Sequence, residues 1–257
     1  MDPNPLLSVS NLSVNFGGLR ALSNINLTIK HGDLVGLIGP NGAGKTTFFN
    51  TLTGLCKPST GQIMFAGFDL TNKAASYISR QGIARTFQNI RLFKSLTVLE
   101  NLMVACHQNI NYSFLTGVLK SKKYRLEEEA GLEEAKRILE IVGLSHHAHE
   151  LSVNLPYGDQ RKLEIARALV TKPKLLLLDE PAAGMNPAET QELLSLIRYL
   201  RSDLGITILL IEHDMNLVMN LCEHIFVLDY GMLIAEGTAA EIRSNEQVIQ
   251  AYLGADV

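Results

Sequence analysis

Residues 39–47, GPNGAGKTT, constrain the fold of this chain more than any other stretch. They follow the short apolar run DLVGLI, which is typical of a buried parallel strand, and they precede TTFFNTLTGL, which has the pattern of a helix. Their spacing fits G-x-x-x-x-G-K-[ST], in which glycine backbone N–H groups wrap around phosphate groups. A strand, a glycine-rich turn and a helix in this order predict an α/β fold with a phosphate-binding loop.

Every residue of this loop is a candidate for binding a nucleotide: Gly39, Pro40, Asn41, Gly42, Ala43, Gly44, Lys45, Thr46 and Thr47. Lys45 is expected to reach the outer phosphates, and the hydroxyl of Thr46 suits Mg²⁺. The alternative is a glycine-rich turn with a chance lysine. The strand before the loop and the helix after it disfavour that alternative.

Two neighbouring carboxylates end the apolar run LLLLDEP. Asp179 is expected to hold Mg²⁺ through water, as a carboxylate beside a phosphate-bound metal does. Glu180 could orient or deprotonate an attacking water. Two solvated carboxylates at a strand end are the alternative, and the upstream phosphate loop favours the metal and water roles.

Apolar periodicity divides the chain into three parts. The first third is strand-rich, with alternating runs at 6–16 and 21–30 that a Gly-Gly turn separates. Helical patterns dominate from about residue 96 to residue 168. A second series of strands follows, with a helix at 188–203 after its first member: 174–180, 206–213, 224–231 and 233–238. Strands that alternate with helices predict a parallel sheet with helices on its faces.

Composition limits the classes of function. The 257 residues are 46% hydrophobic, which suffices for one large domain, and the net charge of −3 gives no basic surplus, so we expect no nucleic-acid partner. The three cysteines are far apart and predict free thiols. The N-terminal residues lack the pattern of a signal peptide, and the longest apolar run is too short to span a bilayer.

Further motifs occur in order along the chain: VNFGG with Phe16, RTFQN with Gln88, YGDQRKLEIARAL from Tyr157, and LLIEHDM with His213. With the phosphate loop and LLLLDEP, this order resembles the nucleotide-binding subunit of an ABC transporter over nearly the whole chain. The resemblance implies a single ABC nucleotide-binding domain over residues 1–257. It would contain a P-loop ABC ATPase core, an N-terminal antiparallel β layer and a helical subdomain inserted at about residues 90–168.

The resemblance also implies roles for these residues. Phe16 would stack on adenine, and Gln88 would bind both nucleotide and Mg²⁺. His213 would contact the γ-phosphate and act in catalysis with Lys45 and Glu180. The signature loop, Ser-Gly-Gly-Gln in the broad family, is expected to bind nucleotide through Tyr157, Gly158, Asp159 and Gln160. Without the resemblance, Phe16 would read as a core aromatic, Gln88 as a surface residue and His213 as a satisfied buried histidine.

A subgroup resemblance rests on YGDQ, RTFQNIRLFKSLTVLENL, DEPAAGMNP and QVIQAYLG. These resemble the ATP-binding subunits of branched-chain amino acid importers. The resemblance implies ATP and Mg²⁺ as cofactors, and ATPase activity that powers uptake through separate integral-membrane permease subunits. It implies a head-to-tail dimer with itself or a paralogous ATPase subunit, and indirectly a substrate-binding protein. The subunit would lie peripherally on the cytoplasmic face of the inner (plasma) membrane.

Other functions fit part of the pattern. Another lone-cassette ABC system, such as a urea or short-amide importer or a lipid or lipopolysaccharide exporter, is the nearest alternative. A soluble ABC protein that acts on ribosomes or DNA would usually carry two cassettes or a long coiled-coil insertion. A P-loop kinase would lack the signature helix before LLLLDEP.

Two features of the subgroup pattern lead to further expectations. Asp159 is a carboxylate in a turn that favours anions, so it either caps the helix that follows or weakens nucleotide clamping by about 2–3 kcal/mol. The family's D-loop usually ends in Asp, whereas this chain has Asn186.

The stretch NIRLFKSLTVLENL, with Phe93 and Leu96 as apolar anchors, is expected to dock a permease helix or else to pack in its own core.

Overall fold

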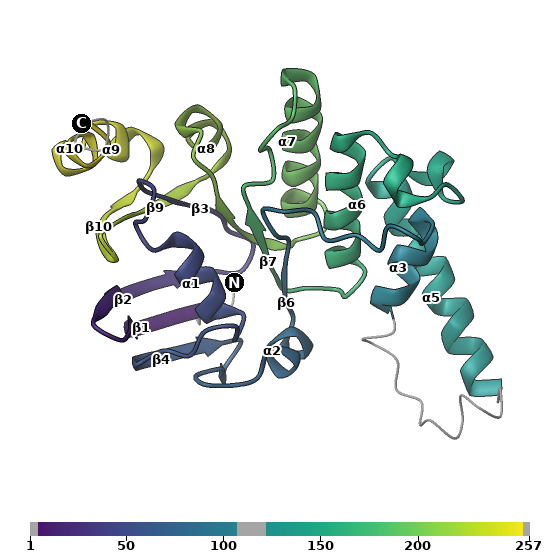
Figure 1. Cartoon of the computed structure of the whole chain (residues 1–257), viewed down its shortest axis with the longest axis horizontal. Coiled ribbons are helices and arrows are strands. Elements are labelled where there is room, and N and C mark those ends of the chain that lie inside the picture. Colours follow the sequence, from purple (N-terminus) through teal and green to yellow (C-terminus); the bar gives the residue numbers. More distant parts are fainter. Residues whose placement is uncertain (1–4, 107–121, 254–257) are drawn as a thin grey trace.

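The structure is a computed structural model that describes residues 5–106 and 122–253. Two sheets of different kinds meet at the middle of this part of the chain, and a group of helices lies at one end (Figure 1). Among the described helices, none is both long enough and apolar enough to span a bilayer. Residues 107–121 of the expected helical subdomain lie outside the described residues.

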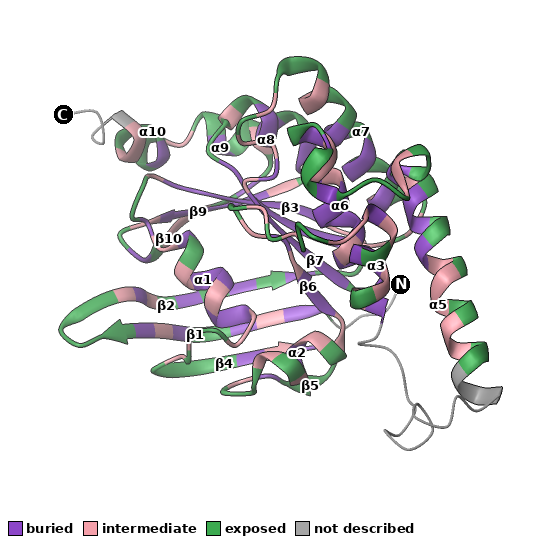
Figure 2. Ribbon diagram, turned by 45° about the vertical axis from the view of Figure 1, so that its right-hand side comes forward, coloured by how far each residue is buried: buried purple, intermediate pink, exposed green. Residues whose placement is uncertain are grey.

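The first sheet is antiparallel, as the alternating runs predict. Its strands lie in the order β2-β1-β4-β5: β1 (Leu7–Phe16), β2 (Leu19–Ile29), β4 (Thr60–Phe65) and β5 (Phe68–Asp69). Gly17 and Gly18 connect β1 to β2, and Leu7 of β1 pairs with Ile29 at the other end. One face of this sheet is buried because alternate side chains of β1 point into the core (Figure 2).

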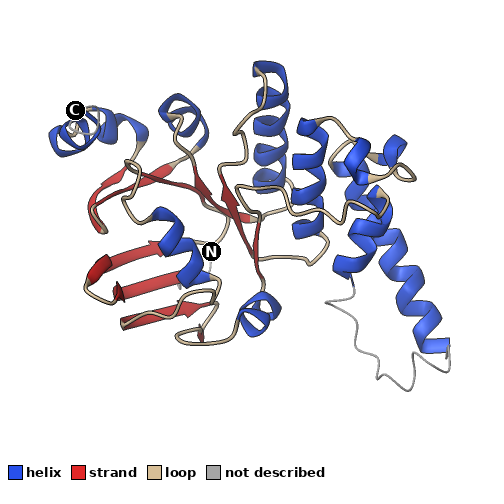
Figure 3. Ribbon diagram, in the orientation of Figure 1, coloured by secondary structure: helices blue, strands red, loops and turns tan. Residues whose placement is uncertain are grey.

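The second sheet is mostly parallel and lies at the centre of the molecule (Figure 3). Its order is β10-β9-β3-β8-β7-β6: β3 (Leu34–Ile38), β6 (Ile83–Arg85), β7 (Leu175–Asp179), β8 (Thr207–Ile211), β9 (His224–Asp229) and β10 (Met232–Gly237). β10 runs antiparallel to β9 at one edge. Every residue of β3, β7 and β8 is buried, since layers cover both faces of this sheet.

Alternate residues of β7 show how the layers are stacked. Leu176 and Leu178 belong to a core that contains Leu163 and Ile197 of two helices. Leu175 and Leu177 belong to a second core, together with residues of the antiparallel sheet and the helix after the phosphate loop. The helices of the ATPase part are α1 (Lys45–Leu52), α2 (Ala75–Gln81), α7 (Pro187–Ser202), α8 (Met215–Leu221), α9 (Ala239–Arg243) and α10 (Glu246–Leu253).

The helices of the middle segment gather on one side of the parallel sheet (Figure 1). They are α3 (Val98–Cys106), α5 (Lys122–Ile141), η2 (Ser145–His147), η3 (Ser152–Asn154) and α6 (Tyr157–Leu169). On α5, Nζ of Lys136 lies 2.8 Å from Oε1 of Glu133. This is the i,i+3 charge pairing expected of an exposed helix. The sequence pattern did not indicate the short elements β5, β6 and α2.

Candidate active site

The phosphate loop connects the buried end of β3 to the first turn of α1. Gly39 has a φ of 151°, and a Cβ at this position would lie 2.0 Å from the carbonyl oxygen of Leu228. A side chain would therefore push the loop away from β9, which explains the glycine. Of the predicted loop residues, 41–47 line an open cavity, whereas Gly39 and Pro40 do not.

Lys45 folds back over its own loop. Its Nζ donates to the carbonyl oxygens of Gly39 at 2.5 Å and Pro40 at 2.9 Å, and the residue is only 8% exposed. Burial lowers the pKa of Lys45, while the charges of Glu180 and Asp179 act in the opposite direction. An anion at the loop would offer this partly desolvated ammonium a stronger acceptor than two neutral carbonyl groups.

The cavity beside the loop has a volume of about 480 Å³, which is typical of a small-molecule site. Gln88 and Glu180 line the same cavity as the loop, and residues from the antiparallel sheet and the β9–β10 turn complete the lining: Phe16, Leu19, Arg20, Ala21, Tyr230 and Gly231. Phe16 is 53% exposed, so it is not a core aromatic. The phosphate loop therefore shares the cavity with two aromatic side chains, Phe16 and Tyr230, and with one charged side chain, Arg20.

Three predicted residues meet at the carboxyl ends of β7 and β8. The Nε2 of Gln88 donates to Oε2 of Glu180 at 2.8 Å, and Nδ1 of His213 lies 3.7 Å from the same oxygen. The backbone of Glu180 has a φ of 46°, which costs a non-glycine residue about 1–3 kcal/mol. Its N–H donates to the carbonyl oxygen of Ile211 at 2.9 Å, which holds this conformation.

Asp179 is the last residue of β7 and forms an ion pair with Arg85, for which no role was predicted. Arg85, at the end of β6, donates to Oδ2 of Asp179 at 2.7 Å and to Oδ1 of Asn50 at 2.7 Å. The guanidinium also lies 5.4 Å from the ring centre of Phe49 and 5.0 Å from that of Phe87. Arg85 opens the motif RTFQN, so the sequence carried a signal, but its partner is 94 residues away.

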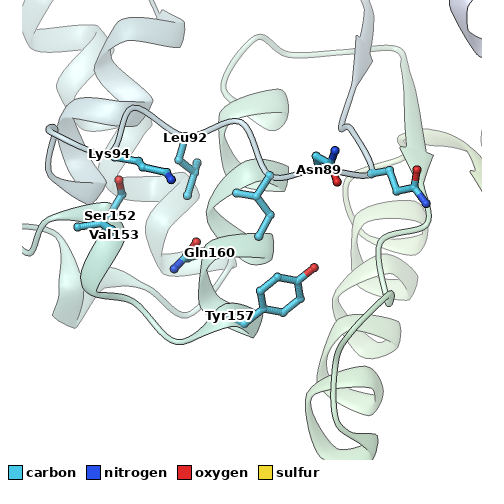
Figure 4. A pocket seen from close by; sticks show the side chains of 9 residues that line it. Asn89, Leu92, Lys94, Ser152, Val153, Tyr157 and Gln160 are labelled. Carbon is cyan, nitrogen blue, oxygen red and sulfur yellow. The ribbon is translucent and has the colours of Figure 1, made fainter.

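The predicted signature residues lie apart from the cavity beside the phosphate loop. Tyr157 and Gln160 line a different pocket, with Asn89, Leu92 and Lys94 on its opposite side (Figure 4). Gln88 lines both cavities. The structure therefore brings Phe16, the phosphate loop, Gln88 and Glu180 together, and leaves the four signature residues outside that group.

Comparison with known proteins identifies the family. The model of the ABC transporter family matches residues 22–183, more than half of the chain. The chain belongs to the ABC transporter family. As an ATP-binding cassette of this family it binds nucleotide and is an ATPase, and the predicted fold class is confirmed. A second family model, "Branched-chain amino acid ATP-binding cassette transporter", matches residues 232–257 of the cassette.

Several relatives resemble the cassette over its whole length. LivG of Escherichia coli strain K12, a high-affinity branched-chain amino acid transport ATP-binding protein, is 51% identical, with 97% of this chain and 98% of LivG covered. An ATP-binding cassette of an ABC transporter, solved in its ADP conformation, is 35% identical with a TM-score of 0.85, covering 98% of this chain and 99% of that chain. A dimeric cassette in a post-hydrolysis state with ADP and Pi is 26% identical with a TM-score of 0.75, covering 91% and 98%.

Asp159 does not cap the signature helix of the cassette, so the first of its two predicted roles, the helix cap, was wrong. The N-cap is Pro156, because α6 begins at Tyr157 and Asp159 lies within its first turn. Oδ1 of Asp159 is 3.3 Å from Nζ of Lys162, and Oδ2 is 4.0 Å from Nε2 of His147. A carboxylate in the first turn favours the helix through the helix dipole.

Asn186 of the D-loop has a local role in the cassette. Its side chain accepts from the N–H of Glu189 at 3.0 Å, and Oε2 of Glu189 accepts from the N–H of Asn186 at 2.9 Å. This is a complete capping box, with Pro187 as the first helical residue of α7. Asn is as good an N-cap as Asp, so the departure from the family pattern preserves the start of α7.

Glu212, which the motif LLIEHDM contains but for which no role was predicted, binds backbone N–H groups in two segments of the site. It is 1% exposed and accepts from the N–H of Ala182 at 3.0 Å and from that of His213 at 3.3 Å. Burial raises its pKa. Its carboxylate therefore links the loop after Glu180 to His213, which lies between β8 and α8.

Proposed function

We propose that this cassette is the ATP-hydrolysing subunit of an importer of branched-chain or related hydrophobic amino acids, working through separate permease subunits. The observation that carries the proposal is its likeness to LivG over nearly all of both chains, at 51% identity. The match of residues 232–257 to the branched-chain family supports the same substrate class. In this role the subunit would lie peripherally at the cytoplasmic face of the membrane and act indirectly with a substrate-binding protein.

The site suggests how its own residues would act on ATP. Lys45 and the backbone of the phosphate loop would bind the phosphates, and Phe16 would contact adenine. Glu180, held by Gln88, would orient or deprotonate the attacking water. His213, whose Nδ1 lies near the same Glu180 oxygen as Gln88, would contact the γ-phosphate.

Oxygen atoms suited to Mg²⁺ are present at the same site. The hydroxyl of Thr46 and the amide oxygen of Gln88 belong to residues that line the cavity. Asp179 is buried and directly precedes Glu180, which also lines the cavity. Such an all-oxygen set fits Mg²⁺, and the pairing of Asp179 with Arg85 fits a contact through water. When bound, Mg²⁺ would neutralise charge on the phosphates.

A second cassette would complete the site. The four signature residues do not line the nucleotide cavity of their own chain, so another subunit would have to offer its signature loop to this cavity. The structure of a related cassette dimer with ADP and Pi supports this arrangement. We infer a head-to-tail dimer, either with itself or with a paralogous ATPase subunit.

The permease would dock at the pocket shown in Figure 4, which has a volume of about 250 Å³. One side of this pocket is the segment 88–94, and the other is formed by Ser152 and Val153 of η3 and by the start of α6 in the proposed helical subdomain, at about residues 90–168. Two buried side chains of α6 hold the segment. Arg161 donates to the carbonyl oxygens of Phe87 and Gln88 at 2.9 and 2.5 Å, and Glu164 accepts from the N–H of Phe87 at 3.3 Å. A displacement of the pocket residues by the permease would therefore move Gln88 and, through its hydrogen bond, affect Glu180.

Two substitutions test the chemistry. Glu180→Gln should keep ATP binding and lower turnover by at least about 100-fold, because the water loses its base. Lys45→Ala should weaken binding itself. Hydrolysis and equilibrium ATP binding are measured on both variants in the purified subunit.

A transport assay tests the substrate class. The cassette is reconstituted with its permease and binding protein in vesicles that contain ATP, and uptake of leucine is compared with uptake of urea. Uptake of leucine that Glu180→Gln abolishes supports the proposal. ATP-driven uptake of urea alone would contradict the substrate class. Near-normal ATP hydrolysis by Glu180→Gln would contradict the catalytic role of Glu180.

A further inference from the structure

The turn between β9 and β10 contains an unexpected residue. Asp229 pairs with Met232, so Tyr230 and Gly231 alone form the connection, with φ values of 42° and 75°. A two-residue hairpin turn with positive φ at both positions is a type I′ turn, which favours Asn, Asp or Gly at the first position. A tyrosine there is disfavoured by its own side chain.

Packing does not explain the tyrosine. Tyr230 is 84% exposed, more than any other large hydrophobic side chain among the described residues. The β4–β5 hairpin has the same geometry at Ala66 and Gly67, with φ values of 49° and 83°, and there a methyl group suffices. A residue that breaks a local rule without a structural gain is often part of a functional site.

The turn is fixed at the edge of the nucleotide cavity. The N–H of Gly231 donates to the carbonyl oxygen of Ala43 in the phosphate loop at 3.0 Å, and its carbonyl oxygen accepts from the N–H of Ser23 at 2.8 Å. A Cβ at Gly231 would lie 2.5 Å from the carbonyl oxygen of Ala21, so the turn lies directly against β2. Tyr230 consequently lines the cavity together with Phe16.

We propose that Tyr230 is a nucleotide-binding residue that contacts the nucleoside, so that aromatic side chains from both sheets line the nucleoside end of the cavity. The proposal rests on the proposed function, in which the phosphate loop binds the phosphates and leaves the base and ribose to the aromatic side. Stacking on an aromatic ring is tolerant of the base, so Tyr230 would add affinity for a purine nucleotide without selecting one.

The test uses three variants of the full chain. Tyr230→Asn removes the ring and supplies a residue that the turn favours, so it should fold at least as well as the wild type. Tyr230→Phe keeps the ring. Ala66→Asn makes the matched change in the other hairpin, away from the cavity. Binding of ADP, ATP, GTP and inorganic tripolyphosphate is measured by calorimetry, and thermal unfolding is followed without ligand.

We expect Tyr230→Asn to bind ADP, ATP and GTP roughly tenfold more weakly, which is the size of one aromatic–base contact. Tyr230→Phe and Ala66→Asn should bind within twofold of the wild type, and tripolyphosphate should bind all variants equally. Unchanged ADP binding by Tyr230→Asn would overturn the proposal. So would an equal loss of tripolyphosphate binding, which would place Tyr230 against phosphate.

A contact with a second cassette is the remaining outcome that would overturn it. In that case Tyr230→Asn would bind ADP normally but would prevent the ATP-dependent dimerisation of a Glu180→Gln background, measured by sedimentation. A wild-type chain that binds no ADP at all would instead contradict the nucleotide site itself. The two failures are therefore distinguishable.

Discussion

Arg85 neutralises the buried carboxylate that is expected to face the metal. The side chains of Arg85 and Asp179 are only 5% and 6% exposed, and water cannot compensate either charge if the other is removed. Removal of one partner of a buried ion pair costs about 3–5 kcal/mol, because an uncompensated charge remains. The pair is therefore expected to stabilise the fold as well as to lie next to Glu180, the proposed catalytic residue.

We expect Arg85→Met to lower the free energy of unfolding by about 3 kcal/mol in urea denaturation of the nucleotide-free protein. The double variant Arg85→Met, Asp179→Asn should recover much of this loss, since no buried charge is left unpaired. Asp179→Asn alone completes the cycle. Additive effects of the two single substitutions would show that the ion pair contributes nothing.

The residues of the site differ in how far the sequence predicts them. Lys45, Thr46 and Glu180 lie in local motifs from which their proposed roles were predicted, and the structure places all three at one cavity. The partner of Asp179 and the position of Tyr230 depend on contacts between distant segments, which no local pattern contains.

Helix α7 begins where the family's usual Asp is replaced by Asn. Its capping box satisfies two N–H groups that would otherwise lack a partner at the helix start. The same corner lies against the signature helix, since a Cβ at Gly158 would be 3.0 Å from the carboxylate of Glu189. The start of α7 is therefore part of the packing between the D-loop and α6.

Asn186→Ala should lower the free energy of unfolding by about 1 kcal/mol, and Asn186→Asp should change it by only a few tenths. Urea denaturation measures both. Thr238→Ala serves as the matched control, because Thr238 and Glu241 form a capping box at the start of α9, outside the D-loop. Its effect gives the free-energy cost of losing a cap alone. If Asn186→Asp is as unstable as Asn186→Ala, the side chain has a role other than capping.

The elements themselves follow closely from apolar runs. Strands β3, β7 and β8 and helix α7 lie where the apolar runs and the helical period predict them. A strand that is buried on both faces is a continuous apolar run, and a helix that is buried along one face has apolar residues at helical spacing. The order of the strands does not follow from these runs. The start of α6 was also missed, because Pro156 and Tyr157 lack the usual signal of an N-cap residue.

The segment 88–94 begins at Gln88, which lines both the phosphate-loop cavity and the pocket of Figure 4, and its proposed docking role can be tested by cross-linking. Burial raises the pKa of Cys106 to about 11 and that of Cys222 to about 12, so only Cys56 needs to be replaced. A cysteine at Lys94 or Val153 should then cross-link to the permease in the assembled transporter.

Lys136, which is exposed on α5, supplies the control position for this experiment. A cysteine there should not cross-link to the permease, because α5 takes no part in the pocket. Absence of cross-links from both pocket positions in an intact complex would exclude the pocket as the docking site.

The place of β3 in the sheet also governs when the site can form during synthesis. β3 pairs with β8 on one side and with β9 on the other. At about 5–20 residues per second, roughly 10 to 40 s pass between the emergence of the phosphate loop and that of these neighbours. During this interval a strand that is apolar on both faces has no neighbour on either side. Nascent chains that end before residue 207 therefore carry the complete phosphate-loop motif without the sheet that shapes it.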